Sequence, residues 1–244
     1  MKIIIIIFFI LFSTKYLWAG DCGVKLEILS IKEAINRVGS EKRIREYKAF
    51  ENRIRLVNLI SSDKKKKFKT VASKRFDIEN IYYPVDQEIY DKVDRFLTKV
   101  MTGYHLNFKK IENEKQAEKF FTMIAEKIVK ELDMQIVDEQ LLLSRAITSH
   151  IFDCDTLATL YLAVGQILNL PIRAVAIPNH VFVRFYFEDG TYFNWETRTW
   201  SSKGNQIYIE EKCLEYNDFE VLDCDSFIEK FIGTDLAFYY YSNL

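Results

Sequence analysis

The sequence predicts an α+β protein in which a mostly helical N-terminal region precedes a helix packed on an antiparallel sheet. Apolar residues recur at steps of three and four from Asp155 to Leu168, as on the buried face of a helix. Three runs rich in β-branched and aromatic residues follow, at 172–177, 180–187 and 191–196. Only short connections separate these runs, so adjacent strands are expected to be antiparallel.

Helical periodicity also marks the chain before this helix. The segment from Ile31 to Ile60 predicts one or two amphipathic helices, and Asp86 to Met101 and Glu112 to Leu132 predict one each. Pro84 and the stretch from Gly103 to Lys110 separate the predicted helices. We therefore expect a helical region in front of the helix and sheet.

Cys154 lies in the first turn of the predicted helix, with Asp153 as its N-cap. The free N–H groups and the dipole of a helix start stabilise a thiolate. Asp153 and Asp155 flank the thiol, however, and their negative charge would raise its pKa. A reactive Cys154 would therefore need a histidine partner.

Turn residues define the strands that follow. Asn169 to Pro171 ends the helix, because the residue before a proline avoids the helical conformation. Pro178 and Asn179 form a turn between the first two strands. Glu188 to Gly190 makes a tight connection, so the second and third strands form a hairpin.

Alternation along these strands predicts which side chains share a face. On one face of the second strand lie His180, Phe182, Arg184 and Tyr186. Asn194 and Glu196 share a face of the third strand, and Phe193 and Trp195 lie on the other. If His180 lies opposite 194–196, a polar group there can hold the imidazole in the required tautomer. The pattern leaves open whether Asn194 or Glu196 does so.

The stretch FDCDTLATLYLAVGQILNLPIRAVAIPNHVFVRFYFEDGTYFNWET resembles the transglutaminase-like superfamily, whose core is related to papain-type thiol proteases. The resemblance spans roughly residues 147 to 200. It matches Cys154 to the nucleophile, His180 to the base, and Asn194 or Glu196 to the third residue. It implies a papain/transglutaminase-like fold and attack on an amide or peptide carbonyl, with the backbone N–H of Cys154 as a candidate oxyanion donor. Phe152 stands where many members have glycine.

Other residues offer competing interpretations. His150 lies four residues before Cys154 and is either a rival base or a helix-end residue. Arg184 is expected to form a salt bridge with Glu196 or to bind a substrate carboxylate. The sequence has no C-x-x-C, no H-x-x-x-H and no glycine-rich phosphate loop. We therefore expect neither a metal nor a cofactor.

The N-terminus predicts export. Ile3 to Phe12 is an unbroken run of ten apolar residues, too short to span a bilayer but suited to a signal peptide that is cleaved near Ala19. A retained membrane anchor is the alternative. In an oxidising compartment Cys213 and Cys224 are the natural disulfide pair to test, with Cys154 kept free. The expected parts are a signal peptide (1–19), a helical N-terminal region (20–104) and a transglutaminase-like core (105–244).

The chain carries 34 basic and 35 acidic residues, a balance that does not predict nucleic-acid binding. The basic run Lys64 to Lys67 is expected to be a solvated loop. We predict an exported, periplasmic or extracellular thiol hydrolase with a protein or peptide substrate, hydrolysis being favoured over transamidation. The alternative is an inactive domain that binds a peptide or partner at the cell envelope. The sequence leaves the oligomeric state open.

Overall fold

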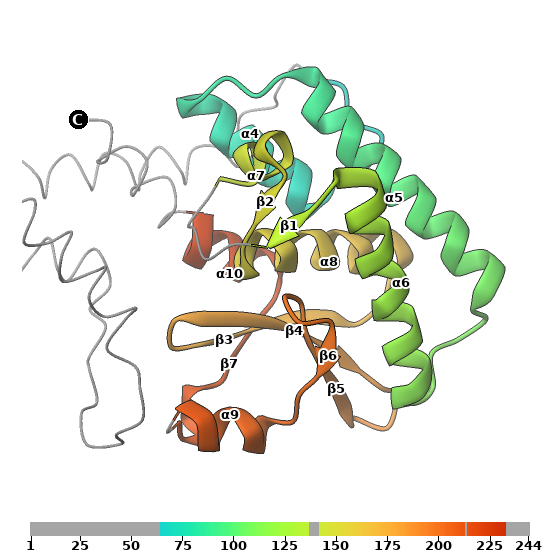
Figure 1. The fold of residues 1–244 in the computed structure, drawn as a ribbon, viewed down its shortest axis with the longest axis vertical. Helices are drawn as coiled ribbons and strands as arrows, with labels where there is room; N and C mark the ends of the chain where they lie inside the picture. The colour runs from blue at the N-terminus through green and yellow to red at the C-terminus, as the bar shows by residue number, and fades with distance from the viewer. Residues whose placement is uncertain (1–63, 137–141, 213, 233–244) are drawn as a thin grey trace, which may run out of the picture.

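The computed structural model describes residues 64–136, 142–212 and 214–232. Within these ranges the chain is α+β, with seven α-helices and a five-stranded antiparallel sheet (Figure 1). The predicted signal peptide, the predicted helices at 31–60 and Cys213 lie outside the described residues. The coarse fold prediction is therefore confirmed for the described part of the chain. No helix in this part is long and apolar enough to cross a membrane.

Three helices form the N-terminal part, namely α4 (Val71–Tyr82), α5 (Gln87–Asn107) and α6 (Glu114–Leu132). The predictions at 86–101 and 112–132 are confirmed as α5 and α6. The helix α4 was not predicted, although Thr70 and Ser73 form a capping box at its start. The basic run at 64–67 lies in the loop before α4, as expected.

The expected break at Gly103 is wrong, because α5 continues through it to Asn107. A Cβ atom added at Gly103 would lie 3.1 Å from Sδ of Met123 on α6. The missing side chain therefore lets α5 and α6 approach closely, and tertiary packing outweighs the low helix propensity of glycine. The helix also runs across position 104/105, where the sequence suggested a domain boundary.

Short elements lead into the helix that carries Cys154. The strands β1 (Gln135–Ile136) and β2 (Ile151–Phe152) pair in parallel, and α7 (Leu143–Ser149) lies between them in sequence. Phe152 is fully buried. The helix α8 (Cys154–Leu168) then begins and ends as predicted.

The five-stranded sheet has the order β6-β5-β4-β3-β7, and all of its neighbouring strands are antiparallel. Its strands are β3 (Ile172–Ile177), β4 (His180–Tyr186), β5 (Tyr192–Glu196), β6 (Ser201–Ser202) and β7 (Glu220–Leu222). The first predicted strand is confirmed at both ends, and the next two are confirmed to within one residue. The polar stretch 201–205 predicts a turn from the sequence, but it contains β6 and the start of α9 (Asn205–Lys212).

Helices cover both faces of this sheet. In Figure 1, α8 lies above the sheet and α9 lies below it. On the α8 side, Nε1 of Trp195 donates a hydrogen bond to the Tyr161 hydroxyl at 3.1 Å. On the α9 side, the rings of Phe182 and Tyr208 stack with their centroids 4.6 Å apart. Phe182 of β4 thus faces α9 and Trp195 of β5 faces α8, on the opposite sides of the sheet that the alternation predicted.

The C-terminal part of the described chain is helical. The helix α10 (Cys224–Phe227) continues into a π-helical segment, η3 (Ile228–Ile232). The sequence predicts a terminal helix from Asp225 to Tyr241. The structure confirms its start, and the residues after 232 lie outside the described part of the chain. Cys224 carries a free thiol. Its expected disulfide partner, Cys213, lies outside the described residues, so that pairing stays a prediction.

Candidate active site

Cys154 is the first residue of α8, and hydrogen bonds hold this helix start. Oδ1 of Asp153 accepts from the backbone N–H of Thr156 at 3.0 Å and from its hydroxyl at 2.6 Å. The backbone N–H of Asp153 donates to the Thr156 hydroxyl at 2.9 Å. This capping box fixes where the helix begins, and therefore where Cys154 lies.

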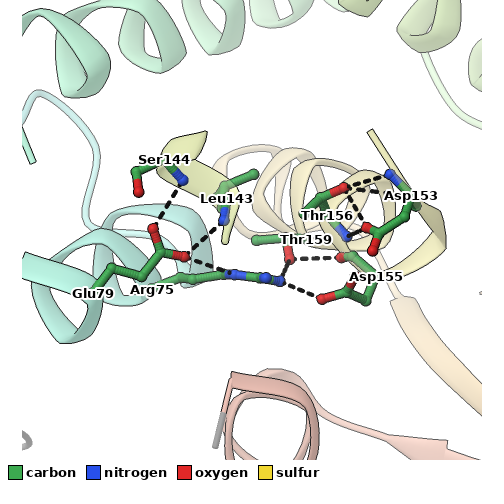
Figure 2. A network of polar contacts seen from close by, with 8 residues as sticks. All are labelled: Arg75, Glu79, Leu143, Ser144, Asp153, Asp155, Thr156 and Thr159. Atoms are coloured by element: carbon green, nitrogen blue, oxygen red, sulfur yellow. Dashed lines mark hydrogen bonds and ion pairs between the residues drawn. The ribbon is translucent and has the colours of Figure 1, made fainter. Parts of the chain in front are cut away.

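A buried polar network also contacts the first turns of α8, through Asp155 and Thr159 (Figure 2). Arg75, on α4, donates from Nη1 to Oδ2 of Asp155 at 2.7 Å and to the hydroxyl of Thr159 at 3.1 Å. Its Nε donates to Oε1 of Glu79 at 3.1 Å. All four residues are buried. The guanidinium thus lies between two carboxylates, as a buried charge requires.

Glu79 extends the network to a third helix. Its carboxylate accepts from the backbone N–H groups of Leu143 and Ser144, each at 2.8 Å (Figure 2). These groups begin α7, and the first N–H groups of a helix have no partner within it. The network therefore connects α4 and α7 to α8 at Asp155, the residue that follows Cys154.

His180 is the first residue of β4 and lies next to Glu196, the last residue of β5. Nε2 of His180 and Oε2 of Glu196 are 2.5 Å apart. The hydroxyl of Tyr208, on α9, donates to the same carboxylate oxygen at 3.0 Å. The side chains of His180 and Glu196 are 11% and 9% exposed, so this hydrogen-bonded group lies in a largely dry environment.

The environment of Glu196 keeps it ionised. Burial by itself would raise the pKa of this carboxyl, but the hydrogen bond and charge of His180 and the hydrogen bond from Tyr208 outweigh it and lower the pKa. An ionised carboxylate only accepts hydrogen bonds, so Nε2 of His180 carries a proton. Nδ1 is then the nitrogen of the neutral imidazole that can accept a proton.

The thiol of Cys154 lies against the strand that carries His180. The backbone N–H of Val181, the second residue of β4, acts on the sulfur and lowers the pKa of the thiol, and α8 packs against β4. Burial, followed by the negative charges of Asp153 and Asp155, raises the pKa of Cys154 well above its usual range. The direction agrees with the expectation that the charges of Asp153 and Asp155 oppose a thiolate at this helix start, and burial adds the largest contribution.

Asn194 is not the partner of His180. Its amide oxygen accepts from Nε of Arg184 at 2.8 Å, and its amide nitrogen donates to Oδ1 of Asn205 at 2.8 Å and to the carbonyl of Lys203 at 3.0 Å. Of the two residues left open by the sequence, Glu196 is therefore the one that contacts His180. Arg184 hydrogen-bonds to Asn194 rather than Glu196, and its guanidinium lies 3.9 Å from the ring centroid of Tyr192.

His150 is a helix-end residue rather than a rival base. It ends α7 in the left-handed conformation, with φ of 63°. Its Nδ1 lies 2.8 Å from the carbonyl oxygen of Leu132. The ring nitrogen thus contacts the end of α6 and is not directed at Cys154.

A cleft of about 710 Å³ opens beside the His180–Glu196 pair. Its lining residues are Ile136, His180, Glu196, Arg198, Thr199, Ser201, Ser202, Lys203, Ile207, Tyr208, Glu211 and Lys212. Cys154 is half-buried and does not line this cleft. Among the described residues, no group of three or more histidine, cysteine or acidic side chains could hold a metal ion.

Sequence reasoning missed Arg75, Tyr208 and the basic residues of the cleft. Arg75 contacts Asp155, 80 positions away, and Tyr208 contacts Glu196, 12 positions away, and no local pattern indicates such contacts. Comparisons of the chain with protein-family models, curated proteins and solved structures give no match. The function of this site is therefore inferred from its own geometry.

Proposed function

We propose that this protein is a thiol enzyme with a papain/transglutaminase-like core that cleaves amide or peptide bonds. Cys154 is the nucleophile, His180 the general base and Glu196 the residue that orients His180. The hydrogen bond between Nε2 of His180 and Oε2 of Glu196, beside the helix start at Cys154, carries this proposal. In this proposal the mature chain acts outside the cytoplasm or at the cell envelope.

The proposed reaction begins with a protonated thiol, because the pKa of Cys154 is raised. Nδ1 of His180 takes the proton as the sulfur attacks the carbonyl carbon, and Glu196 stabilises the imidazolium that forms. The imidazolium then gives the proton to the departing amine, which leaves a thioester on Cys154. Water then attacks this thioester and gives a proton to His180. The C–S bond breaks, which releases a carboxylic acid, and His180 returns the proton to the sulfur.

Acylation by 4-nitrophenyl acetate tests this proposal. The wild-type protein is expected to release nitrophenol in a burst and to gain the mass of one acetyl group on the peptide that contains Cys154. Cys154→Ala should abolish both signals. We expect His180→Ala to slow acylation by about 100-fold or more, and Glu196→Gln by about tenfold or more.

The matched control is Cys224→Ala, which removes another half-buried thiol of the described chain. It should leave the burst unchanged. Acetylation of Cys154 at a rate that is the same in wild type and His180→Ala would contradict the proposed pair.

A specific observation favours a second function, that of a binding module. Cys154 lies outside the cleft lining, and burial together with two carboxylates keeps its thiol protonated. In this alternative the cleft binds a peptide or partner at the cell envelope without chemistry at Cys154. The same acylation experiment separates the two functions, since a binding module would give neither a burst nor an acetylated Cys154.

A further inference from the structure

The cleft beside His180 has a basic lining. Its charged residues other than His180 are Glu196, Arg198, Lys203, Glu211 and Lys212, three cations and two carboxylates. Both carboxylates are held by other lining groups. Glu196 accepts from His180 and Tyr208, and Glu211 accepts from Nζ of Lys203. The described lining thus carries an excess of positive charge.

Two of the cations, Arg198 and Lys212, line the cleft together with His180 and Glu196. Arg198 follows Glu196 by two residues, and its backbone N–H lies 3.5 Å from Oε1 of that carboxylate. Lys212 ends α9, the helix that carries Tyr208. Both side chains are half-buried, so their charges are screened less than charges on the open surface.

These cations also act on the thiol. The positive charge of Arg198 lowers the pKa of Cys154, opposing the larger effect of burial, and the charge of Cys154 in turn raises the pKa of Lys212. Lys212 itself has a lowered pKa, first because burial disfavours its charged form. A bound anion would offset that loss of hydration.

We propose that the cleft takes an acidic amide substrate, whose carboxylate lies beside the attacked carbonyl and is held by Arg198 and Lys212. This inference rests on the proposed function and names the substrate class of the same site. Guanidinium and ammonium groups at the edge of a cleft are the usual partners of a carboxylate. Ile136 and Ile207, 37% and 43% exposed, provide apolar contact for the rest of the substrate.

Alkylation of Cys154 by iodoacetate and by iodoacetamide tests the inference. The two reagents have nearly the same shape, but iodoacetate carries a carboxylate on the carbon that the sulfur attacks. We expect the ratio of the iodoacetate rate to the iodoacetamide rate to be higher at Cys154 than in an unfolded cysteine peptide. Arg198→Gln and Lys212→Gln should each lower this ratio by about fivefold, whereas Arg198→Lys and Lys212→Arg should retain it.

Two controls separate a local effect from a general one. Lys115→Gln removes the same charge from an exposed site on α6 and should leave the ratio unchanged. The ratio at Cys224, read by peptide mass spectrometry in the same samples, should be the same in every variant.

A ratio at Cys154 that equals that of the unfolded peptide, or that is the same in Arg198→Gln, Lys212→Gln and wild type, would overturn the inference. This failure is distinct from failure of the proposed function. The latter is read from acylation by uncharged 4-nitrophenyl acetate and from its dependence on His180.

Discussion

At the scale of single residues, the site combines an oriented histidine, the proposed base, with a protonated thiol, the proposed nucleophile. Glu196 is ionised and hydrogen-bonded to His180, whereas the pKa of Cys154 is raised by burial and by two neighbouring carboxylates. The positive groups of the cleft oppose those carboxylates only in part. Chemistry at Cys154 would therefore require proton transfer to His180 during attack, rather than a thiolate formed beforehand.

The charge of Asp153 can be removed without removing its helix cap, because asparagine is an equally good N-cap residue. Asp153→Asn takes away one source of the raised pKa of Cys154, so thiolate should form at lower pH. We expect the midpoint of the pH profile of iodoacetamide labelling at Cys154 to fall by about half to one pH unit. Burial remains, so the midpoint should stay above that of an ordinary thiol.

Asp86→Asn is the matched control for this variant. Asp86 is also the N-cap residue of a helix, α5, and its side chain is exposed. It should leave the midpoint unchanged. An unchanged midpoint in Asp153→Asn would show instead that the carboxylate of Asp153 does not affect the thiol.

At the scale of elements, the helical glycines Gly165 and Gly103 differ in whether the neighbouring atoms could make room for a side chain. A Cβ atom at Gly165 on α8 would lie 3.0 Å from Cβ of Ile172 and 3.4 Å from the carbonyl oxygen of Leu170. Neither atom can move without the backbone. At Gly103 the nearest atom is the sulfur of Met123, on a flexible side chain.

Alanine at these two positions should therefore change stability in opposite directions. Alanine favours a helix over glycine by about 1 kcal/mol, and Gly103→Ala should retain part of that gain because Met123 can move. Gly165→Ala should lower the free energy of unfolding by about 1–2 kcal/mol, since overpacking outweighs the gain. Urea denaturation of both variants measures the difference, and an increase in stability for Gly165→Ala would contradict the packing described here.

At the scale of the whole molecule, a few buried charges hold the helical part to the site. Arg75 on α4 contacts Asp155 at the start of α8 and Glu79, which in turn binds the start of α7. A buried ion pair of this kind adds little net stability compared with an apolar replacement of the whole group. Removal of one member is different, because it leaves a buried charge without compensation.

Arg75→Met should therefore lower the free energy of unfolding by about 3–5 kcal/mol. Lys74→Met, one residue before Arg75, is the matched control. Lys74 makes an exposed ion pair with Asp225, and loss of such a pair should change stability by less than about 1 kcal/mol. Equal effects of the two variants in urea denaturation would show that the buried network does not stabilise α8.

Local signals were sufficient for much of this fold. The strand at 172–177 was predicted at both ends because Pro171 and Pro178 flank it. The start of α8 was predicted because Asp153 is a strong N-cap residue. Local signals failed where tertiary contact decides the structure, as at Gly103 and in the short strand β6.

The same distinction applies to the candidate site. Cys154 and His180 could be singled out from their order and local setting, and the hairpin brought Asn194 and Glu196 to one face. The choice between these two depended on α9, from which Tyr208 hydrogen-bonds to Glu196 and Asn205 to Asn194. The flanking carboxylates indicated from the sequence that the pKa of Cys154 would be raised, but burial, the largest cause, is something that no local pattern measures.

The contact between Arg75 and Asp155 also has a consequence for biogenesis. The two residues are 80 positions apart, and Arg75 is synthesised first. The ribosome thus delivers the supporting helices before the helix that carries Cys154, which can dock on them as it emerges. A chain that begins after α4 would therefore lack the guanidinium of Arg75, which holds the buried carboxylate of Asp155 at the start of α8.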